Sequence, residues 1–547
     1  MAAKPKRLAI TISGAVSLGS YEAGVLYEVL RALGEHNEDP ATTEAERIEV
    51  DVLTGASAGG MTATIAAQVL LAGNERLASA SDNAFFKPWV EEVDLAGLLR
   101  CDAKDDPATH SILASSMVEK LGAKHIPDRP NGTPHPAAPK SGVVRLGLAM
   151  SQLNGVDYTK RAEDAAGPSE FTYTRFQDEF TCTIPGAVPS ADWSQARAAA
   201  LACGAFPFAF RCRGMTRRQA DYPPTAALFP SDPREMAFLD GGIFHNEPLG
   251  LAKNLVEEID GHRDNDSRFY LFVSPGRKSG VSDVATPLRA ADLTLLRTAK
   301  SLMKSVFWQA RFQDWINAEK MNQRIASLDV TARNLAEQML RDPTLASTIE
   351  PGVGALLPLY FAGRVGELDA AVARLRVEYE ELKTPAGPRN FAVELGEPAA
   401  TIWLKAVLLL EHAAGLAEKE TMTIYTITAD DQSLAGEKFF AFAGFMDERA
   451  RQHDYNVGRE NARRWLRAGA AGLFPIRASF AEAIPPIDPK LGEWELRDFD
   501  RRKRETLVEQ VRDRADLMMK ELGVGGFLRG VIDRFVLRPK LRKAMGL

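Results

Sequence analysis

Short apolar runs that end in glycine-bearing turns alternate with helical patterns in the first 75 residues. The run Leu8–Ile12 leads through one such loop into the helical pattern SYEAGVLYEVLRAL, and Ile48–Thr54 leads through a second turn into GGMTATIAAQVLLA. Strands that alternate with helices predict an α/β fold with a largely parallel central sheet flanked by helices. Both turns then lie at the carboxyl ends of strands, where such folds place catalytic loops.

The later part of the chain changes from this mixed pattern to long helices and then returns to a strand. Helical spacing of apolar positions runs from about Asp292 to Gly415, and it predicts an additional helical region. Further strands are predicted at 143–151, 171–180, Phe269–Pro275 and 421–430, a small-residue helix at 194–208, and a helix pair at 443–466. We therefore expect three regions, an α/β domain at 1–285, a helical insertion or lid-side region at 286–420, and a returning strand with a C-terminal helical segment at 421–547.

Length and charge narrow the class of protein. A chain of 547 residues is too long for one ordinary core, and 45% hydrophobic with 26% charged residues is typical of a soluble globular protein. The net charge of -6, from 67 basic and 73 acidic residues, argues against a nucleic-acid partner bound by bulk charge. The four cysteines are widely spaced, which favours reduced thiols and a cytoplasmic location over a disulfide framework.

Neither a signal peptide nor a membrane-spanning helix is predicted. The basic start MAAKPKRLAITISG has a short apolar run soon broken by glycine, which is typical of a first strand. The longest apolar run, near Trp403, is too short to cross a bilayer and contains Lys405. Any membrane contact is therefore expected to be peripheral.

A serine stands among small residues in the second glycine turn, VLTGASAGGMTA. Gly55, Ser57 and Gly59 have the G-x-S-x-G spacing of a nucleophile elbow, a sharp strand-to-helix turn that lifts the serine hydroxyl into the open. Glycine suits the flanking positions because larger side chains would collide with neighbouring backbone. The alternative is a glycine-rich turn that a serine merely caps.

The first glycine turn, SGAVSLGSYEAG, is the candidate oxyanion hole. Its small residues Gly14 and Ala15 lie between a strand and a helix, where backbone N–H groups converge on negative charge. Gly14 to Gly19 also match the G-x-x-x-x-G of a nucleotide loop, but Ser20 and Tyr21 stand where that loop needs lysine and Ser or Thr. A glycine turn used only for packing is the other alternative.

The segment FLDGGIFHNEP holds the candidate general base. Asp240 ends an apolar strand, and Gly241 and Gly242 allow the backbone to turn tightly away from it. A carboxylate held in this way can accept the serine proton directly. Two alternatives stay open, a common Asp-Gly turn and a Ser–His–Asp triad in which His245 is the base.

Four segments, in this order, resemble the patatin-like phospholipase family of bacterial type. They are the loop SGAVSLGSYEAGVL, the elbow GASAG, the helix RAAALACGAFPFAF and the DGG that precedes Asn246 and Pro248, and HDYNVGRENARRWL is similar to a closing segment of many bacterial members. The resemblance covers about the first 275 residues and implies a patatin-like three-layer α/β fold.

The resemblance also implies a catalytic mechanism. Ser57 would be the nucleophile and Asp240 the base of a dyad without histidine, with an oxyanion hole of backbone amides around Gly14, Ala15 and Val16. The implied activity is hydrolysis of acyl esters of phospholipid or lysophospholipid without a metal or other cofactor.

The chain departs from the family pattern at the oxyanion loop. Ala15 and Val16 stand where the family usually has glycine, and Leu18 replaces its basic residue before Gly19. Loss of one oxyanion donor typically lowers the rate on the order of 100- to 1000-fold. The alternative function is therefore not enzymatic. It is a catalytically weak or silent scaffold that binds a membrane or a partner.

Metal ligation has no support in the sequence, which contains neither H-E-x-x-H nor C-x-x-C. The segment DNDSRF begins like a calcium loop, but Phe269 and Pro275 stand where glycine and the acidic ligand are needed, so a solvated turn is expected. The sequence predicts no oligomeric state.

Two segments are candidates for contact with lipid. The C-terminal GVGGFLRGVIDRFVLRPKLRKAMGL combines apolar residues near helical spacing with six cations against Asp533 alone, which is typical of a basic amphipathic segment. The alternative is a terminal helix packed on the body with its basic face in water. The aromatic residues of Leu302–Ile316 are the second candidate, with a core role as their alternative.

Overall fold

The computed structural model describes most of the chain and divides it into two compact units. The described residues are 5–100, 107–164, 167–186, 191–260, 267–276, 293–361, 365–384, 387–416, 424–429, 434–437, 441–468, 475–495 and 498–547. The first unit comprises Met1–Asp314 with Ile424–Leu547, and the second comprises Trp315–Thr423. The segment at 264–269, which is predicted to be a solvated turn, lies largely outside the described residues.

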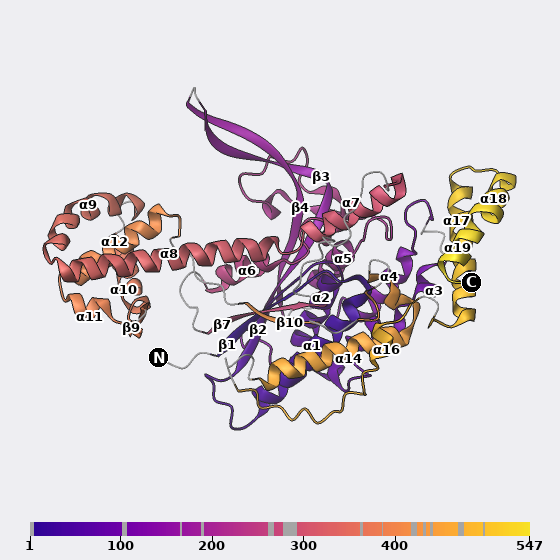
Figure 1. Cartoon of the computed structure of the whole chain (residues 1–547), viewed down its shortest axis with the longest axis horizontal. Coiled ribbons are helices and arrows are strands. Elements are labelled where there is room, and N and C mark those ends of the chain that lie inside the picture. The colour runs from indigo at the N-terminus through magenta and orange to yellow at the C-terminus, as the bar shows by residue number, and fades with distance from the viewer. Residues whose placement is uncertain are drawn as a thin grey trace. The chain divides into compact units, whose positions relative to one another are not determined.

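An eight-stranded, mostly parallel sheet forms the centre of the first unit. Figure 1 shows its strands together with the helices around them. The strand order is β10-β7-β1-β2-β3-β6-β5, and β4 pairs with β3 off this path. The strands are β1 (Lys6–Ile12), β2 (Ile48–Gly55), β3 (Val143–Asp164), β4 (Gly167–Pro185), β5 (Arg213–Arg217), β6 (Arg234–Asp240), β7 (Arg268–Ser274) and β10 (Ile424–Thr428). Pairings from β10 through β3 are parallel, whereas β4, β5 and β6 pair antiparallel. The predicted α/β fold with a largely parallel sheet is confirmed.

Helices cover both faces of this sheet. On β3, an added Cβ at Gly147 would contact Leu251 of α6 (Leu249–Asp260), whereas the adjacent Leu148 lies beside Gly60 of α2 (Ser57–Ala72). Successive residues of a strand point to opposite faces, so α6 and α2 lie on opposite sides of the sheet. The fold therefore has the three layers expected of a patatin-like domain.

Two long helices of the first unit, α1 (Gly19–Glu38) and α14 (Glu448–Arg467), cross with their backbones in contact. A Cβ at Gly24 of α1 would lie 2.0 Å from the carbonyl oxygen of Tyr455, and one at Gly458 of α14 would lie 2.1 Å from that of Tyr21. Glycine at both positions permits this close approach. The C-terminal part of the chain thus packs directly against the first helix of the α/β domain.

The prediction of a helix pair at 443–466 is wrong. The structure has a short 3-10 turn at Ala443–Met446 followed by the single helix α14. Asp447 caps that helix by accepting a hydrogen bond from the N–H of Arg449, and no proline interrupts the helix afterwards. The glycine within it, Gly458, serves the contact with α1 and does not end the helix.

The remaining helices of the first unit lie around the sheet and at the C-terminus. They are α3 (Leu95–Leu98), α4 (Ser115–His125), α5 (Ala191–Cys203), α7 (Leu295–Gln309), α16 (Pro489–Gly492), α17 (Arg501–Glu521), α18 (Gly526–Ile532) and α19 (Arg538–Ala544). A π-helical segment, η3 (Lys87–Glu92), precedes α3, and another, η9 (Asp533–Leu537), joins α18 to α19.

The second unit is helical and has a hydrophobic core of its own. Trp403 lies at the centre of that core, and its indole N–H donates to the carbonyl oxygen of Ala332 at 2.9 Å. The elements are most of α8 (Gln313–Arg341), then α9 (Thr344–Phe361), α10 (Val365–Glu378), β8 (Leu382–Thr384), β9 (Gly387–Arg389), α11 (Phe391–Leu395) and α12 (Ala399–Ala413).

Among the described residues, no single helix combines the length and the apolar character needed to cross a membrane. One bent pair, Thr344–Phe361 with Gly366–Glu378, meets both criteria only when its two helices are taken together.

Candidate active site

Ser57 occupies a strained turn between β2 and α2. Its φ of 51° lies in the left-handed region, which is uncommon for a residue other than glycine and is typical of a nucleophile elbow. A Cβ at Gly55 would lie 2.5 Å from the backbone of Gly59, and a Cβ at Gly59 would lie 2.2 Å from the carbonyl oxygen of Ser13. The two glycines flanking Ser57 are therefore required by the close packing of this turn against β1 and its loop.

Asp240, at the end of β6, lies directly beside Ser57. The hydroxyl of Ser57 donates to Oδ2 of Asp240 at 2.5 Å, although 183 positions separate the two residues in sequence. The other carboxylate oxygen, Oδ1, accepts from the N–H of Gly242 at 2.7 Å. A Cβ at Gly241 would lie 2.1 Å from the carbonyl oxygen of Ala149, so the DGG turn also needs its glycine. Both oxygens of the carboxylate are thus fixed in orientation.

The Asp240 carboxylate is buried, and this changes its acidity. Burial raises its pKa from 3.8 to about 7, while the hydrogen bonds from Ser57 and Gly242 act in the opposite direction. A group with a pKa near neutrality can accept a proton and return it at physiological pH.

The first glycine loop lies over Ser57. A Cβ at Gly14 would lie 3.2 Å from Cβ of Ser57 and 2.2 Å from Oδ1 of Asn246, so glycine is needed for this close approach. The N–H of Gly14 donates to the carbonyl oxygen of Asn246 at 3.0 Å and is therefore engaged within the protein. This leaves Ala15 and Val16 as the candidate oxyanion donors of the loop. Val16 has a φ of 53°, so its Cβ has not prevented the left-handed conformation.

The start of α2 provides a further candidate donor. In an elbow of this kind the N–H after the nucleophile points toward the developing oxyanion, and here that group belongs to Ala58. The positive end of the α2 dipole lies at the same place.

Leu18, the residue that departs from the family pattern, is buried. A Cβ at Gly436 would lie 3.0 Å from Cδ2 of Leu18, so the leucine packs against the segment 434–437. A buried apolar side chain fits this position, and the chain places no cation there.

His245 faces away from the serine. Its Nε2 is 2.8 Å from Oδ2 of Asp314, and its Nδ1 is 3.0 Å from Nε2 of Gln177, so both ring nitrogens have hydrogen-bond partners other than Ser57. Asp314 in turn accepts from the N–H of Gly250 at 2.6 Å. The structure therefore brings Asp240 and not His245 to the serine hydroxyl.

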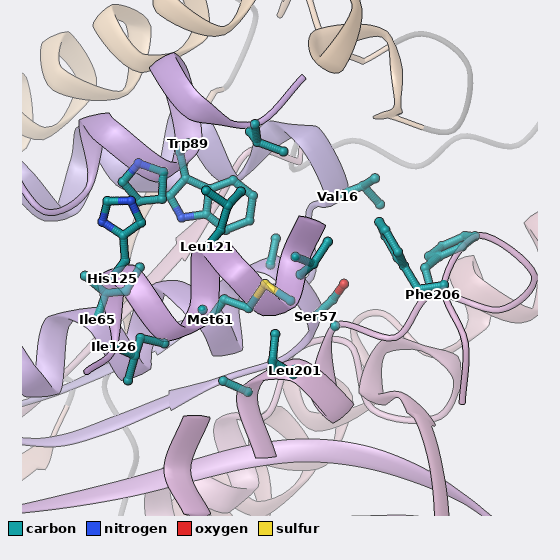
Figure 2. Close-up of a pocket in the computed structure, with 18 of the residues that line it drawn as sticks. Val16, Ser57, Met61, Ile65, Trp89, Leu121, His125, Ile126, Leu201 and Phe206 are labelled. Atoms are coloured by element: carbon teal, nitrogen blue, oxygen red, sulfur yellow. The ribbon is translucent and has the colours of Figure 1, made fainter. Parts of the chain in front are cut away.

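An apolar cavity extends from Ser57 along α2. The empty space at this cavity, together with its part open to solvent, amounts to about 820 Å³. Ser57, Met61 and Ile65 are spaced by four residues on one face of α2, so the cavity follows the helix for about 12 Å. In Figure 2, Val16 and Phe206 lie at the Ser57 end, and Ile65, His125 and Ile126 lie away from it. The other lining residues are mostly apolar: Ala58, Pro88, Trp89, Val93, Leu98, Val118, Leu121, Gly122, Ala200, Leu201, Gly204, Phe210 and Phe445.

Within the described residues, no group of three or more His, Cys, Asp or Glu side chains is arranged to hold a metal ion. Cys203 and Cys212, two of the cysteines that the structure describes, are free thiols.

Two features of the site have no clear counterpart in the sequence reasoning. Asn246 is part of the motif that supports the resemblance, but its carbonyl oxygen also binds the N–H of Gly14 and so connects the DGG turn to the oxyanion loop. Its position six residues after Asp240 is the only signal for this role. The cavity wall contributed by η3 and α4 carries no motif at all, because apolar lining residues have the composition of an ordinary core.

Comparison with known proteins agrees with this geometry. Residues 10–253 match the family model described as Patatin-like phospholipase, so this segment is a patatin-like phospholipase domain, and the family inferred from the motifs is confirmed. The match supports a place among lipid acyl hydrolases.

Two curated relatives are similar over part of their length. An uncharacterized membrane protein of Mycobacterium tuberculosis, Rv3479, is 25% identical over 368 residues, which are 55% of this chain and 32% of the relative. The uncharacterized protein y4iI of Sinorhizobium fredii is 24% identical over 319 residues, 45% of each chain. This chain thus spans less than half the length of the curated relatives it matches.

Proposed function

We propose that this chain hydrolyses fatty acyl esters of phospholipid or lysophospholipid through a Ser57–Asp240 dyad, without a metal. The observation that carries the proposal is the 2.5 Å hydrogen bond between the two side chains at one end of an apolar cavity. A nucleophile in contact with its base, beside a space suited to hydrocarbon, is the arrangement that acyl transfer from a lipid requires.

Acylation begins when Ser57 Oγ attacks the ester carbonyl carbon and its proton passes to Oδ2 of Asp240. Negative charge then develops on the carbonyl oxygen. In this proposal, the N–H groups of Ala15, Val16 and Ala58 stabilise that charge. When the tetrahedral intermediate collapses, Asp240 returns the proton to the leaving alcohol, and the acyl group stays on Ser57.

Deacylation repeats these steps with water as the nucleophile. Asp240 takes a proton from the water, and the second tetrahedral intermediate forms on Ser57. Its collapse releases the fatty acid while Asp240 returns the proton to Ser57 Oγ. The pKa near 7 allows Asp240 to serve as base and then as acid in both halves of the reaction.

The substrate class follows from the cavity. Its walls are almost entirely aliphatic and aromatic, and burial of methylene groups against them gives about 0.8 kcal/mol each. One chain along α2 suits the acyl group that is transferred to Ser57. The headgroup lies beyond this cavity, so phospholipase A and lysophospholipase activity are both included in the proposal, together with peripheral contact at a membrane.

The test uses purified wild type, Ser57→Ala and Asp240→Asn with mixed-lipid vesicles in the presence of a chelator, and products are read by mass spectrometry. The proposal expects wild type to release free fatty acid and both variants to release almost none. Activity that disappears only with the chelator would contradict metal independence.

Two alternatives give different outcomes in the same assay. A scaffold would release no fatty acid as wild type and would bind vesicles equally well as Ser57→Ala. A histidine-assisted esterase would retain activity as Asp240→Asn and lose it as His245→Ala. The hydrogen bonds of His245 to Gln177 and Asp314 favour the dyad over this second alternative.

A further inference from the structure

Exposed apolar side chains cover the last helical segments of the chain, from Leu522 to Val536. Phe527 is 89% exposed and Phe535 is 70% exposed, whereas aromatic residues of this size are usually buried to a large extent. Leu522, Leu528, Val531 and Val536 are exposed beside them. We call α18, η9 and α19, with these residues, the C-terminal surface; all three segments lie at the C-terminal end of the chain in Figure 1.

The same surface carries unpaired positive charge. In the described part of the chain, no carboxylate lies within ion-pair distance of Arg534, Lys540, Arg542 or Lys543. The acidic residue of these segments, Asp533, is neutralised by Arg512, whose Nε is 2.6 Å from Oδ1 of Asp533. The surface therefore combines exposed aromatic rings with an excess of cations.

Contacts with α17 hold this surface on the body of the first unit. Arg504 of α17 donates to the carbonyl oxygen of Met545 at 2.7 Å, and Arg529 of α18 pairs with Asp516 at 2.7 Å. At its other side, α17 is held by Arg514, which donates to the carbonyl oxygen of Ser111 at 3.1 Å. The exposed residues thus stand on a helix that is itself fixed to the α/β domain.

α17 also packs against the wall of the acyl cavity. Leu507 of α17 belongs to one hydrophobic cluster with Leu98 and Phe445, and both of these residues line the cavity. The C-terminal surface is therefore connected to the cavity wall through α17.

A second exposed apolar site links the cavity to α17. Phe208, 70% exposed, lies between Phe206 and Phe210, which line the cavity. Its carbonyl oxygen accepts from the N–H of Ile112 at 2.8 Å, and the carbonyl oxygen of Ile112 accepts from Arg514 at 3.2 Å. Exposed apolar side chains thus occur both beside the cavity and on the C-terminal segments.

We propose that the C-terminal surface docks this chain onto an anionic lipid bilayer. Aromatic and aliphatic side chains would enter the boundary between headgroups and acyl chains, and the free cations would contact anionic headgroups. A second copy of the chain is a poorer occupant, because a symmetric contact through this surface would bring its free cations face to face. Docking itself does not depend on the proposed function. Delivery of substrate from the bilayer to the cavity does rest on that function.

Vesicle flotation with the inactive Ser57→Ala chain tests docking without hydrolysis. The proposal expects binding to vesicles of phosphatidylglycerol and phosphatidylcholine, and about 10-fold or more weaker binding to phosphatidylcholine alone or at high salt. Phe527→Ser with Phe535→Ser, and separately Arg534→Glu with Lys540→Glu, are each expected to weaken binding at least about 10-fold. The matched control replaces two exposed apolar residues elsewhere, Leu228→Ser with Val393→Ser, and is expected to bind like the parent.

Two results would overturn the proposal. One is equal binding by the surface variants and the control. The other is concentration-dependent dimerisation in analytical ultracentrifugation that the surface variants abolish, without any vesicle binding by the parent, since this would identify a second copy as the occupant.

Activity in the otherwise wild-type chain separates this inference from the proposed function. The surface variants are expected to hydrolyse a soluble short-chain ester at the wild-type rate and to lose about 10-fold or more of the rate on anionic vesicles. Absence of both activities in wild type would contradict the proposed function and leave the flotation result to decide docking.

Discussion

Asp240 ends β6 and His245 follows five residues later; both are buried, yet they belong to different sites. Asp240 binds the hydroxyl of Ser57, whereas His245 binds Gln177 and Asp314. Either residue type can serve as the base of a serine hydrolase, so chemistry alone does not distinguish them. The tight turn at Gly241 and Gly242 directs the two side chains to different partners. Asp240 lies against Ser57, whereas His245 lies against Asp314.

The two side chains also differ in the charges that surround them. Among the described residues, no cation pairs with Asp240 to offset its burial, and its pKa rises to about 7. His245 is paired with a carboxylate, which fixes the ring in place. A buried group that lacks an opposite charge is costly for the fold, and such groups are often retained for function.

The largest expected effect is the loss of catalytic rate when the Ser57–Asp240 pair is broken. Ser57→Ala removes the nucleophile, so kcat/KM on any ester substrate is expected to fall at least about 10⁴-fold. The measurement is a soluble-ester assay with circular dichroism to verify folding. Ser115→Ala, which changes a buried serine at the start of α4, is the matched control and is expected to retain activity. Residual activity of Ser57→Ala above a few per cent would exclude Ser57 as the nucleophile.

Asp240→Asn is expected to stabilise the fold at alkaline pH. A folded-state pKa of about 7 against an unfolded value near 3.8 means that the folded state binds more protons between these pH values, so stability falls as pH rises through this window. Removing the charge recovers at most about 4 kcal/mol above pH 7 and little below pH 4. The amide can still accept from the N–H of Gly242 and donate to Ser57.

The measurement for this prediction is the unfolding midpoint in urea at pH 8 and at pH 5, with wild type in parallel. Asn154→Asp, the reverse exchange at an exposed position, is the control and is expected to show no comparable change of stability with pH. An equal or lower stability of Asp240→Asn at pH 8 would contradict the raised pKa.

Gly241→Ala tests whether the turn separates the two groups. The added methyl would meet the backbone of Ala149 at 2.1 Å, so a loss of about 3 kcal/mol in the free energy of unfolding is expected. Gly354→Ala in α9, where nothing lies within 4 Å of the added Cβ, is expected to stabilise by about 1 kcal/mol. Denaturant unfolding of both variants gives the comparison, and similar values would contradict a requirement for glycine at 241.

Ile65→Trp is designed to fill the end of the apolar cavity that lies away from Ser57. Because Ile65 lies about 12 Å along α2 from Ser57, long acyl chains are expected to lose about 10- to 30-fold in kcat/KM while short chains are little affected. The ratio of rates on long-chain and short-chain esters is the measurement. A uniform loss for all lengths would place the acyl chain elsewhere.

The smallest effect on the catalytic rate is expected when His245 is replaced. His245→Ala removes hydrogen bonds to Gln177 and Asp314 and leaves the half-buried Asp314 without its imidazole partner, so the fold is expected to lose about 1–3 kcal/mol. The rate on a soluble ester is expected to stay within about 10-fold of wild type. A loss as large as that of Ser57→Ala would contradict the assignment of roles.

Much of the fold was accessible from sequence because its signals are local. The runs that became β1 and β2, the glycine turns after them and the helices α1 and α2 follow directly from apolar spacing and glycine placement. The helix pair predicted at 443–466 failed because the 3-10 turn before α14 carries the same apolar pattern as a helix. The packing of α14 on α1 depends on Gly24 and Gly458, which only tertiary contact brings together.

The candidate site was accessible in part for the same reason. Ser57 and Asp240 stand in recognisable turns, but the choice between Asp240 and His245 required the partners of each side chain. The engagement of Gly14 by Asn246 was also hidden, since it is a backbone hydrogen bond between segments 232 positions apart. Cavity walls leave no local signal, because apolar residues that line a cavity resemble those that fill a core.

The pH dependence of kcat/KM on a soluble ester, for wild type and Asp240→Asn, tests the central assignment most directly. Asp240 must be ionised to accept the proton of Ser57, so the wild-type rate is expected to rise with pH through an apparent pKa of about 7 and then level off. Asp240→Asn is expected to lose about 10²- to 10⁴-fold and this pH dependence with it. A variant that keeps both the rate and the profile would show that Asp240 is not the base.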